Sequence, residues 1–111
     1  MGHRKYCLAL DLKNEPALIE AYKEHHKNVW PQIIDSITES GIENLEIYNV
    51  ENRLFMIMVV NESFSFEAKT VADNQNPVVQ EWEALMWCFQ QALPFAPKGE
   101  KWMLMDKIFE L

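Results

Sequence analysis

The sequence predicts an α+β fold of the ferredoxin-like type, a sandwich in which helices cover one face of an antiparallel sheet. Three observations predict it. Residues 4–12 alternate in polarity as a half-buried strand does, and two later stretches repeat apolar residues with the period of a helix. Between those stretches, two apolar segments are joined by Glu51-Asn52, which is typical of a tight hairpin turn. Together these observations give the order β-α-β-β-α-β.

The first strand is expected over residues 4–12. One of its faces carries Tyr6, Leu8, Leu10 and Leu12, and the other carries Cys7, Ala9 and Asp11. The helix that follows is expected to have Asn14 as its N-cap, Pro16 in its first turn and Lys27 near its end.

The Trp30-Pro31 pair divides this first helical region in two. A residue before proline is pushed out of the helical conformation, so one helix should end before Trp30 and another should begin at Pro31. An apolar stripe at helical spacing follows: Trp30, Ile33, Ile34 and Ile37. Gly41 fits the position just past the end of a helix, where the backbone often turns left-handed.

The remaining elements follow from the same periodicities. Strands are expected over residues 42–50 and 53–61, and a short helix over 64–72. The next helical stripe consists of Val78, Trp82, Leu85, Met86, Phe89 and Leu93. The segment 93–99, with two prolines, is expected to be a loop, and residues 102–111 the last strand.

Length and composition indicate a single domain over residues 1–111. Of these 111 residues, 49% are hydrophobic and 24% are charged, so the chain can bury a core of its own. The formal net charge of −7 argues against a nucleic-acid partner, which needs a basic surface, and against an anionic membrane surface. A small neutral substrate suits this charge better.

Cysteine usage indicates a cytoplasmic protein. Cys7 and Cys88 are the only cysteines, too few for a disulfide framework, and we expect both to be reduced. No apolar run reaches about 18 residues, the length that spans a membrane. The start of the chain lacks the apolar segment of a signal peptide.

The third and fourth expected strands are apolar on both faces. The third contains LFMIMVV, and the fourth has Trp102, Leu104 and Ile108 on one side with Met103, Met105 and Phe109 on the other. An antiparallel sheet with one face in water should instead alternate. Since the helices cover only one face, we expect a second copy of the chain to cover the other, giving a homodimer.

The segment 20–33, EAYKEHHKNVWPQI, concentrates side chains that can carry chemistry. Tyr22 and His26 are four residues apart and share a helix face, whereas His25 lies about 100° around the helix from His26. Spacing alone favours a packing role for such a pair, and the same holds for Trp30, Tyr48 and Trp82. No HExxH pattern or acidic cluster accompanies the histidines, so no metal site is expected.

Tyr22, His26 and Trp30-Pro31, spaced four residues apart, resemble the signature of the L-rhamnose mutarotase family. Similar residues follow in the family's order: Gly41, Asn44, Ile47, Tyr48, Trp82, Met86, Pro94, Pro97 and the ending Ile108-Phe109-Glu110-Leu111. No single motif decides the match, but the ordered set covers almost the whole chain.

The resemblance implies an aldose mutarotase, a carbohydrate epimerase of the dimeric α/β-barrel type, that interconverts the α and β anomers of a 6-deoxy-L-hexose such as L-rhamnose. It implies that His26 is the catalytic proton donor and that Tyr22 and Trp82 contact the sugar. Trp30 and Tyr48 can add apolar walls and a hydroxyl group. Neither a cofactor nor a metal is needed, because histidine titrates near neutral pH and can exchange protons with the sugar oxygens. The group that assists His26 is a carboxylate, a tyrosine or water.

Two positions depart from the family pattern. Leu45 and Glu83 stand where family members have aromatic side chains that touch the sugar. Glu83 can instead accept a hydrogen bond from a sugar hydroxyl, although a glutamate there is also typical of a solvated helix face. Because relatives also occur in L-fucose use, L-fucose is the alternative substrate.

Two functions of other classes stay open. The ferredoxin-like fold also hosts dimeric oxygenases that act on a quinol or a haem, which would need a larger and drier apolar cavity. The other is a small-molecule binding module without catalysis, in which Tyr22 and His26 would share no cavity.

Overall fold

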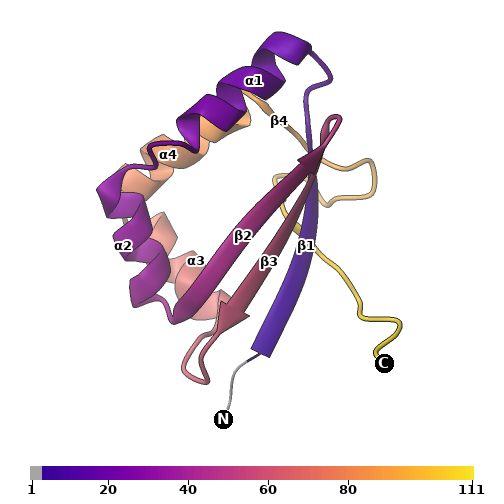
Figure 1. The fold of residues 1–111 in the computed structure, drawn as a ribbon. Helices are drawn as coiled ribbons and strands as arrows, with labels where there is room; N and C mark the ends of the chain where they lie inside the picture. Colours follow the sequence, from indigo (N-terminus) through magenta and orange to yellow (C-terminus); the bar gives the residue numbers. More distant parts are fainter. Residues whose placement is uncertain (1–3) are drawn as a thin grey trace.

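The computed structural model describes residues 4–111 as a layer of helices on one face of a five-stranded antiparallel sheet (Figure 1). In chain order the elements are β1 (Arg4–Leu12), α1 (Pro16–His25), α2 (Pro31–Glu39), β2 (Ile42–Val50), β3 (Arg53–Val60), α3 (Phe66–Asn74), α4 (Pro77–Trp87), β4 (Gln90–Gln91) and β5 (Met103–Leu104). The strand order is β2-β3-β1-β4, and β5 also pairs with β1. This is the predicted ferredoxin-like plan, with each helical region divided into two helices.

The three long strands form where the polarity pattern predicts them. β1 pairs with β3 along nearly its whole length, and β2 and β3 form a hairpin through the expected turn at Glu51-Asn52. Glu51 has a φ of 53°. Asn49 Nδ2 holds the turn by donating hydrogen bonds to the carbonyl oxygens of Glu51 and Arg53. The hairpin fixes the register, and the register decides which side chains face the helices.

The helix boundaries confirm the proline and glycine signals but not the first N-cap. α2 begins at Pro31 and ends just before Gly41, which has a φ of 100°. α1 has Pro16 as its first residue and Glu15 as its N-cap, without a side-chain capping bond, so the prediction for Asn14 was wrong. Proline suits the first helical position because its missing N–H would have no helical partner there. It therefore places the start of α1 without help from a capping side chain.

Three helices differ from their expected ranges. α4 ends at Trp87, so Phe89 and Leu93 of the expected helical stripe lie beyond it. α1 ends at His25 rather than near Lys27, because the chain turns at the C-cap His26. α3 begins at Phe66 rather than at residue 64, because Ser65 is its N-cap and accepts a hydrogen bond from the backbone N–H of Ala68.

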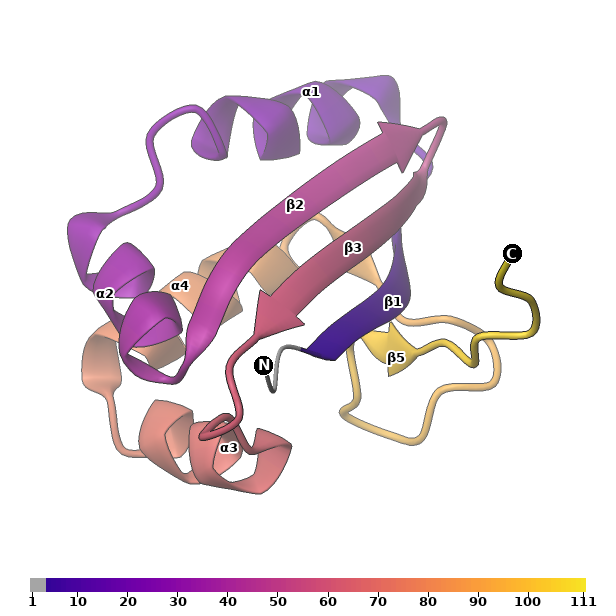
Figure 2. The ribbon, with the colours of Figure 1, turned by 60° about the horizontal axis from the view of Figure 1, so that its bottom comes forward.

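The last strand is much shorter than predicted, which corrects the expectation for residues 102–111. Only Met103–Leu104 of that range pairs with β1 (Figure 2). A strand that was not predicted, Gln90–Gln91, pairs with the other end of the same edge. The two short strands thus share the edge that one long strand was expected to fill.

The edge of β1 limits how far the last strand can extend, and β5 ends before that limit is reached. Leu104 pairs with Leu8, so only Arg4–Cys7 of β1 remain beyond that pair, a shorter edge than residues 105–111 would need. The apolar side chains of this segment then find no surface to pack on within the chain. Ile108 is 93% exposed and Phe109 is 76% exposed.

The core lies between the helices and the face of the sheet that they cover. Its larger cluster of buried residues consists of Leu12, Tyr22, Ile33, Leu54, Val79, Trp82, Met86 and Phe89. A second cluster consists of Leu8, Ile42, Met58, Val60 and Phe64. Across residues 4–111, no helix is long and apolar enough to cross a membrane.

Candidate active site

A cavity of about 840 Å³ lies between the helices and the covered face of the sheet. Four residues singled out in the sequence line it: Tyr22, His26, Trp82 and Glu83. Residues of the three long strands line it as well, among them Leu8, Leu45, Ile47, Met56 and Met58. Cavities of about 300–1,000 Å³ with mainly apolar walls and a few polar groups are typical of small-molecule sites.

α1 turns Tyr22 and His26 toward the same part of this cavity. Their ring centroids are 4.3 Å apart, as the spacing of four residues predicts. Nδ1–H of His26 donates a hydrogen bond to the backbone carbonyl oxygen of Tyr22 at 2.9 Å. Because this bond keeps the proton on Nδ1, Nε2 of the neutral ring carries the lone pair that can accept a proton.

Burial keeps both of these side chains uncharged at neutral pH. Burial, the largest effect, lowers the pKa of His26 below its ordinary value; the hydrogen bond to Tyr22 opposes this, and the charge of His25 adds to it. Burial likewise raises the pKa of Tyr22 to about 12. The hydrogen bond from Gln90 lowers this pKa, and the charge of Glu83 raises it further. His26 is therefore placed to act as a base, and the Tyr22 hydroxyl stays a hydrogen-bond donor.

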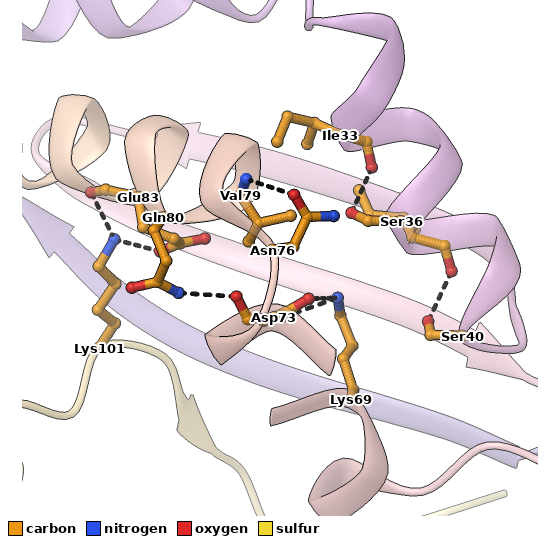
Figure 3. A network of polar contacts seen from close by, with 11 residues as sticks. Ile33, Ser36, Ser40, Lys69, Asp73, Asn76, Val79, Gln80, Glu83 and Lys101 are labelled. Carbon is orange, nitrogen blue, oxygen red and sulfur yellow. Dashed lines mark hydrogen bonds and ion pairs between the residues drawn. The ribbon is translucent and has the colours of Figure 1, made fainter. Parts of the chain in front are cut away.

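α4 supplies the opposite wall of the site. Asn76 caps this helix, because its Oδ1 accepts hydrogen bonds from the backbone N–H groups of Val78 at 3.0 Å and Val79 at 3.3 Å. Figure 3 shows the bond from Val79. Trp82, on the next turn, is buried, and its ring meets that of His26 edge-on with 5.9 Å between centroids. Trp82 thus forms a rigid apolar surface beside the imidazole.

Trp30 supports this wall from behind. Its ring packs against Trp82 in a T-shaped contact with 5.0 Å between centroids. Trp30 is not among the residues that line the cavity. Trp30 thus contacts Trp82 and does not itself line this cavity.

Glu83 is held in place by Lys101. The Lys101 ammonium forms an ion pair with the Glu83 carboxylate and donates a hydrogen bond to the Glu83 backbone carbonyl at 3.1 Å (Figure 3). The same ammonium lies 4.8 Å from the centre of the Trp87 ring. Glu83 is thus a partly exposed carboxylate at the cavity wall that is paired with Lys101.

The structure does not bring Tyr48 or His25 into this cavity. Tyr48 pairs with Phe55 on the face of the sheet that the helices leave uncovered, and it is 55% exposed. It therefore cannot touch a ligand that lies beside His26 of the same chain. The ring of His25 lies 5.3 Å from that of Phe89, and His25 is not among the lining residues, in agreement with its offset around the helix.

Gln90 belongs to the cavity wall although no sequence pattern singles it out. It is 4% exposed, and its Nε2 donates a hydrogen bond to the Tyr22 hydroxyl at 3.4 Å. It comes from β4, a strand of two residues that is too short to show a periodicity. Across residues 4–111, no group of three or more His, Cys, Asp or Glu side chains is placed to hold a metal ion.

Comparison with known proteins identifies the family. The family model for L-rhamnose mutarotase matches residues 5–111. The chain belongs to the L-rhamnose mutarotase family. A relative in Xanthomonas campestris, named L-fucose mutarotase, is 42% identical over 100% of this chain and 90% of its own length. An L-rhamnose mutarotase from Sinorhizobium fredii is 30% identical over 74% of this chain and 75% of its own length.

A solved structure of a family member has the same fold. The crystal structure of an L-rhamnose mutarotase from Formosa agariphila matches with a TM-score of 0.72 and 19% identity, covering 97% of this chain and 98% of that chain. This likeness confirms the predicted fold. Membership of the family places the chain among mutarotases, the enzymes that interconvert sugar anomers.

Proposed function

We propose that this chain interconverts the α and β anomers of a 6-deoxy-L-hexose by opening and closing the pyranose ring. His26 is the catalytic residue, and Tyr22, Trp82 and Glu83 contact the sugar. The observation that carries the proposal is the neutral His26, fixed in one tautomer by the Tyr22 carbonyl, at the wall of a cavity of suitable size. Membership of the L-rhamnose mutarotase family supports it.

The chemistry needs a proton acceptor at the anomeric hydroxyl and a proton donor at the ring oxygen, and one imidazole can serve as both. Opening the ring removes a proton from the anomeric hydroxyl, breaks the bond between the anomeric carbon and the ring oxygen, and delivers a proton to that oxygen. Nε2 of His26 accepts the first proton, and the imidazolium donates it to the ring oxygen. This donation leaves His26 neutral. After the open aldehyde rotates, Nε2 takes the proton back from the former ring oxygen as that oxygen attacks the other face of the aldehyde, and the imidazolium returns the proton to the aldehyde oxygen, which again leaves His26 neutral.

The other cavity residues hold the sugar during this exchange. Trp82 offers an apolar surface for the C–H face of the ring, and the neutral Tyr22 hydroxyl can donate a hydrogen bond to a sugar oxygen. Glu83, fixed by Lys101, is placed to accept a hydrogen bond from a sugar hydroxyl.

Two sugars are the candidate substrates. The family name favours L-rhamnose. L-Fucose is favoured by the relative named L-fucose mutarotase, which is 42% identical over the whole chain. The cavity also presents Leu45 and Glu83, the two departures from the family's aromatic contacts. L-Rhamnose and L-fucose differ in the orientation of their hydroxyls, which a fixed carboxylate can distinguish.

Exchange spectroscopy by NMR tests the proposed reaction, because it follows the interconversion of anomers against the slow spontaneous rate. We expect the wild-type protein to accelerate exchange of L-rhamnose, L-fucose or both. Binding of these sugars without exchange would instead support a non-catalytic binding module. If the protein neither binds these sugars nor exchanges their anomers, but binds a quinol or a haem, the oxygenase alternative would be supported.

We also propose that the chain is a homodimer joined through the uncovered faces of its sheets, and that it works in the cytoplasm. Cys7, Ala9, Phe55, Ile57 and Val59 share the uncovered face and are only partly buried. A second copy would cover this apolar surface. The two free thiols, Cys7 and Cys88, are in keeping with a reducing compartment.

A further inference from the structure

Gln90 is a buried polar side chain of the cavity whose hydrogen bonding is incomplete. It is 4% exposed, and it lines the cavity together with Tyr22 and His26. Its Nε2 donates to the Tyr22 hydroxyl, whereas its Oε1 has no hydrogen-bond partner among residues 4–111. Buried side-chain oxygens in folded proteins almost always have a partner, because losing water without replacement is costly. A partner from outside the chain would satisfy Oε1.

The sheet register points Gln90 toward the cavity. Gln90 pairs with Leu12 at the end of β1, and Leu12 is fully buried on the face that the helices cover. Paired residues of adjacent strands lie on the same face, and successive residues lie on opposite faces. Gln91 accordingly pairs with Asp11 on the other face and is exposed. The placement of Gln90 is therefore set by the backbone of β4.

Gln90 and Tyr22 together present one acceptor and one donor. The Tyr22 oxygen accepts the hydrogen bond from Gln90 Nε2, at 3.4 Å, so the Tyr22 proton is available to another acceptor. Gln90 Oε1 is buried, and its capacity to accept a hydrogen bond is unused. A hydroxyl group is both a donor and an acceptor, so a single hydroxyl can satisfy both.

We propose that Gln90 is a specificity-determining residue, whose Oε1 accepts a hydrogen bond from the ring hydroxyl of the sugar that Tyr22 also contacts. This inference rests on the proposed function, because it takes the ligand to be a 6-deoxy-L-hexose. A sugar that lacks this hydroxyl, or carries it on the other side of the ring, leaves Oε1 buried and unpaired. A site built to pair a hydroxyl discriminates strongly against such a sugar.

The test combines Gln90→Met with sugars that lack one ring hydroxyl at a time. Met has a similar length and no hydrogen-bonding amide, and Gln91→Met is the matched control on the exposed side of the same strand. Both kcat/KM for anomer exchange and Kd for sugar binding are measured by NMR. On the complete sugar, we expect Gln90→Met to lower kcat/KM about 2- to 10-fold, the effect of losing one neutral hydrogen bond. On the deoxy sugar that lacks the paired hydroxyl, the variant should equal or exceed the wild type, because it no longer leaves an amide oxygen unpaired.

The outcomes separate this inference from the proposed function. An equal loss on every sugar would show that Gln90 only supports the fold, and no loss on any sugar would show that Oε1 has no part in recognition; either result overturns the inference. If the wild type binds the sugars without exchanging their anomers, the proposed catalysis fails, and the same comparison of Kd values still decides the role of Gln90. If Gln90→Met does not fold, Gln90→Asn replaces it. The shorter side chain of asparagine draws the amide oxygen back from the sugar and keeps a polar group at this position.

Discussion

At the scale of the residue, His26 and His25 are adjacent in sequence but have different surroundings. His26 lines the cavity and is bonded to the Tyr22 carbonyl, whereas His25 packs beside Phe89. We expect His26→Ala to lower kcat/KM for anomer exchange by about 100-fold or more, the usual contribution of a general acid–base residue, with circular dichroism unchanged. His25→Ala should change kcat/KM by less than about threefold. Equal losses in the two variants would mean that the assigned roles are wrong.

The lowered pKa of His26 predicts the acidic side of the pH profile. Catalysis needs the neutral imidazole, so kcat/KM should fall as the pH drops through the pKa of His26 in the free enzyme. Since burial lowers this pKa, the midpoint should lie below the ordinary value of 6.5, and NMR titration of the His26 ring should give the same midpoint. His25→Ala should move the midpoint upward, because the charge of His25 is one of the causes of the lowering. A midpoint above 6.5 would contradict the role of burial.

The same shift has a consequence for stability. The pKa of His26 is lower in the folded protein than in the unfolded chain, so below pH 6.5 the unfolded chain binds more protons. His26 therefore contributes fully to stability when the pH is above its pKa in the unfolded chain. This contribution is lost as the pH falls through the lower pKa that His26 has in the folded protein. Tyr22, with a pKa of about 12, stays protonated over the range in which a mutarotase would be assayed.

How well the sequence predicts a site residue depends on the distance of its contacts along the chain. The Tyr22–His26 pair could be predicted, because four residues on a helix fix their relative position locally. The placement of Tyr48 depends on strand register and on which face the helices cover. The contact of Gln90 with Tyr22 joins residues 68 apart and depends on a two-residue strand. The alternation of Leu45 and Ile47 with Glu46 marks the face that Tyr48 takes, whereas the contact of Gln90 leaves no periodic signal in the sequence.

At the scale of the element, short local signals place the ends of the helices that carry the site. Pro31 and Gly41 bound α2 as predicted, because proline and glycine restrict or permit backbone angles regardless of their surroundings. Asn14 gave a weaker signal. An N-cap preference is worth about 1 kcal/mol, and the proline at the start of α1 sets the boundary one residue later.

Gly41 allows a prediction about the junction between α2 and β2. It has a φ of 100°, and a Cβ added there would lie 2.6 Å from Oδ1 of Asn61. Gly99 has a φ of 84° with no atom within 4 Å of such a Cβ, and so it isolates the backbone effect. We expect Gly99→Ala to lower the free energy of unfolding by about 1–2 kcal/mol, and Gly41→Ala to lower it by more. Urea denaturation at one protein concentration measures both, and an equal loss would show that Asn61 moves aside without cost.

At the scale of the whole molecule, the sequence predicts the topology better than the extent of its last strand. The order of elements follows from periodicities that act within each segment. The limits of β5 depend instead on how much of the β1 edge is open after the chain returns to it. Two-sided apolar character in residues 102–111 indicated burial on both faces, but within one chain Ile108 and Phe109 are exposed. These two side chains add to the apolar surface that the chain leaves exposed.

The uncovered face of the sheet gives the prediction on assembly. Ile57 lies near the middle of this face, opposite Cys7 on β1 and Glu46 on β2. In a single copy a lysine at this position would lie at the surface beside a carboxylate, whereas in a dimer it would be buried between two apolar sheets, where an unpaired charge is very costly. We therefore expect the wild-type protein to sediment at about twice 13.1 kDa at micromolar concentration, and Ile57→Lys to sediment near 13.1 kDa with its secondary structure intact. Val71→Lys, which makes the same change at an exposed position of α3, should remain dimeric. A wild-type monomer, or an Ile57→Lys variant that stays dimeric, would show that the sheet face is not the interface between copies.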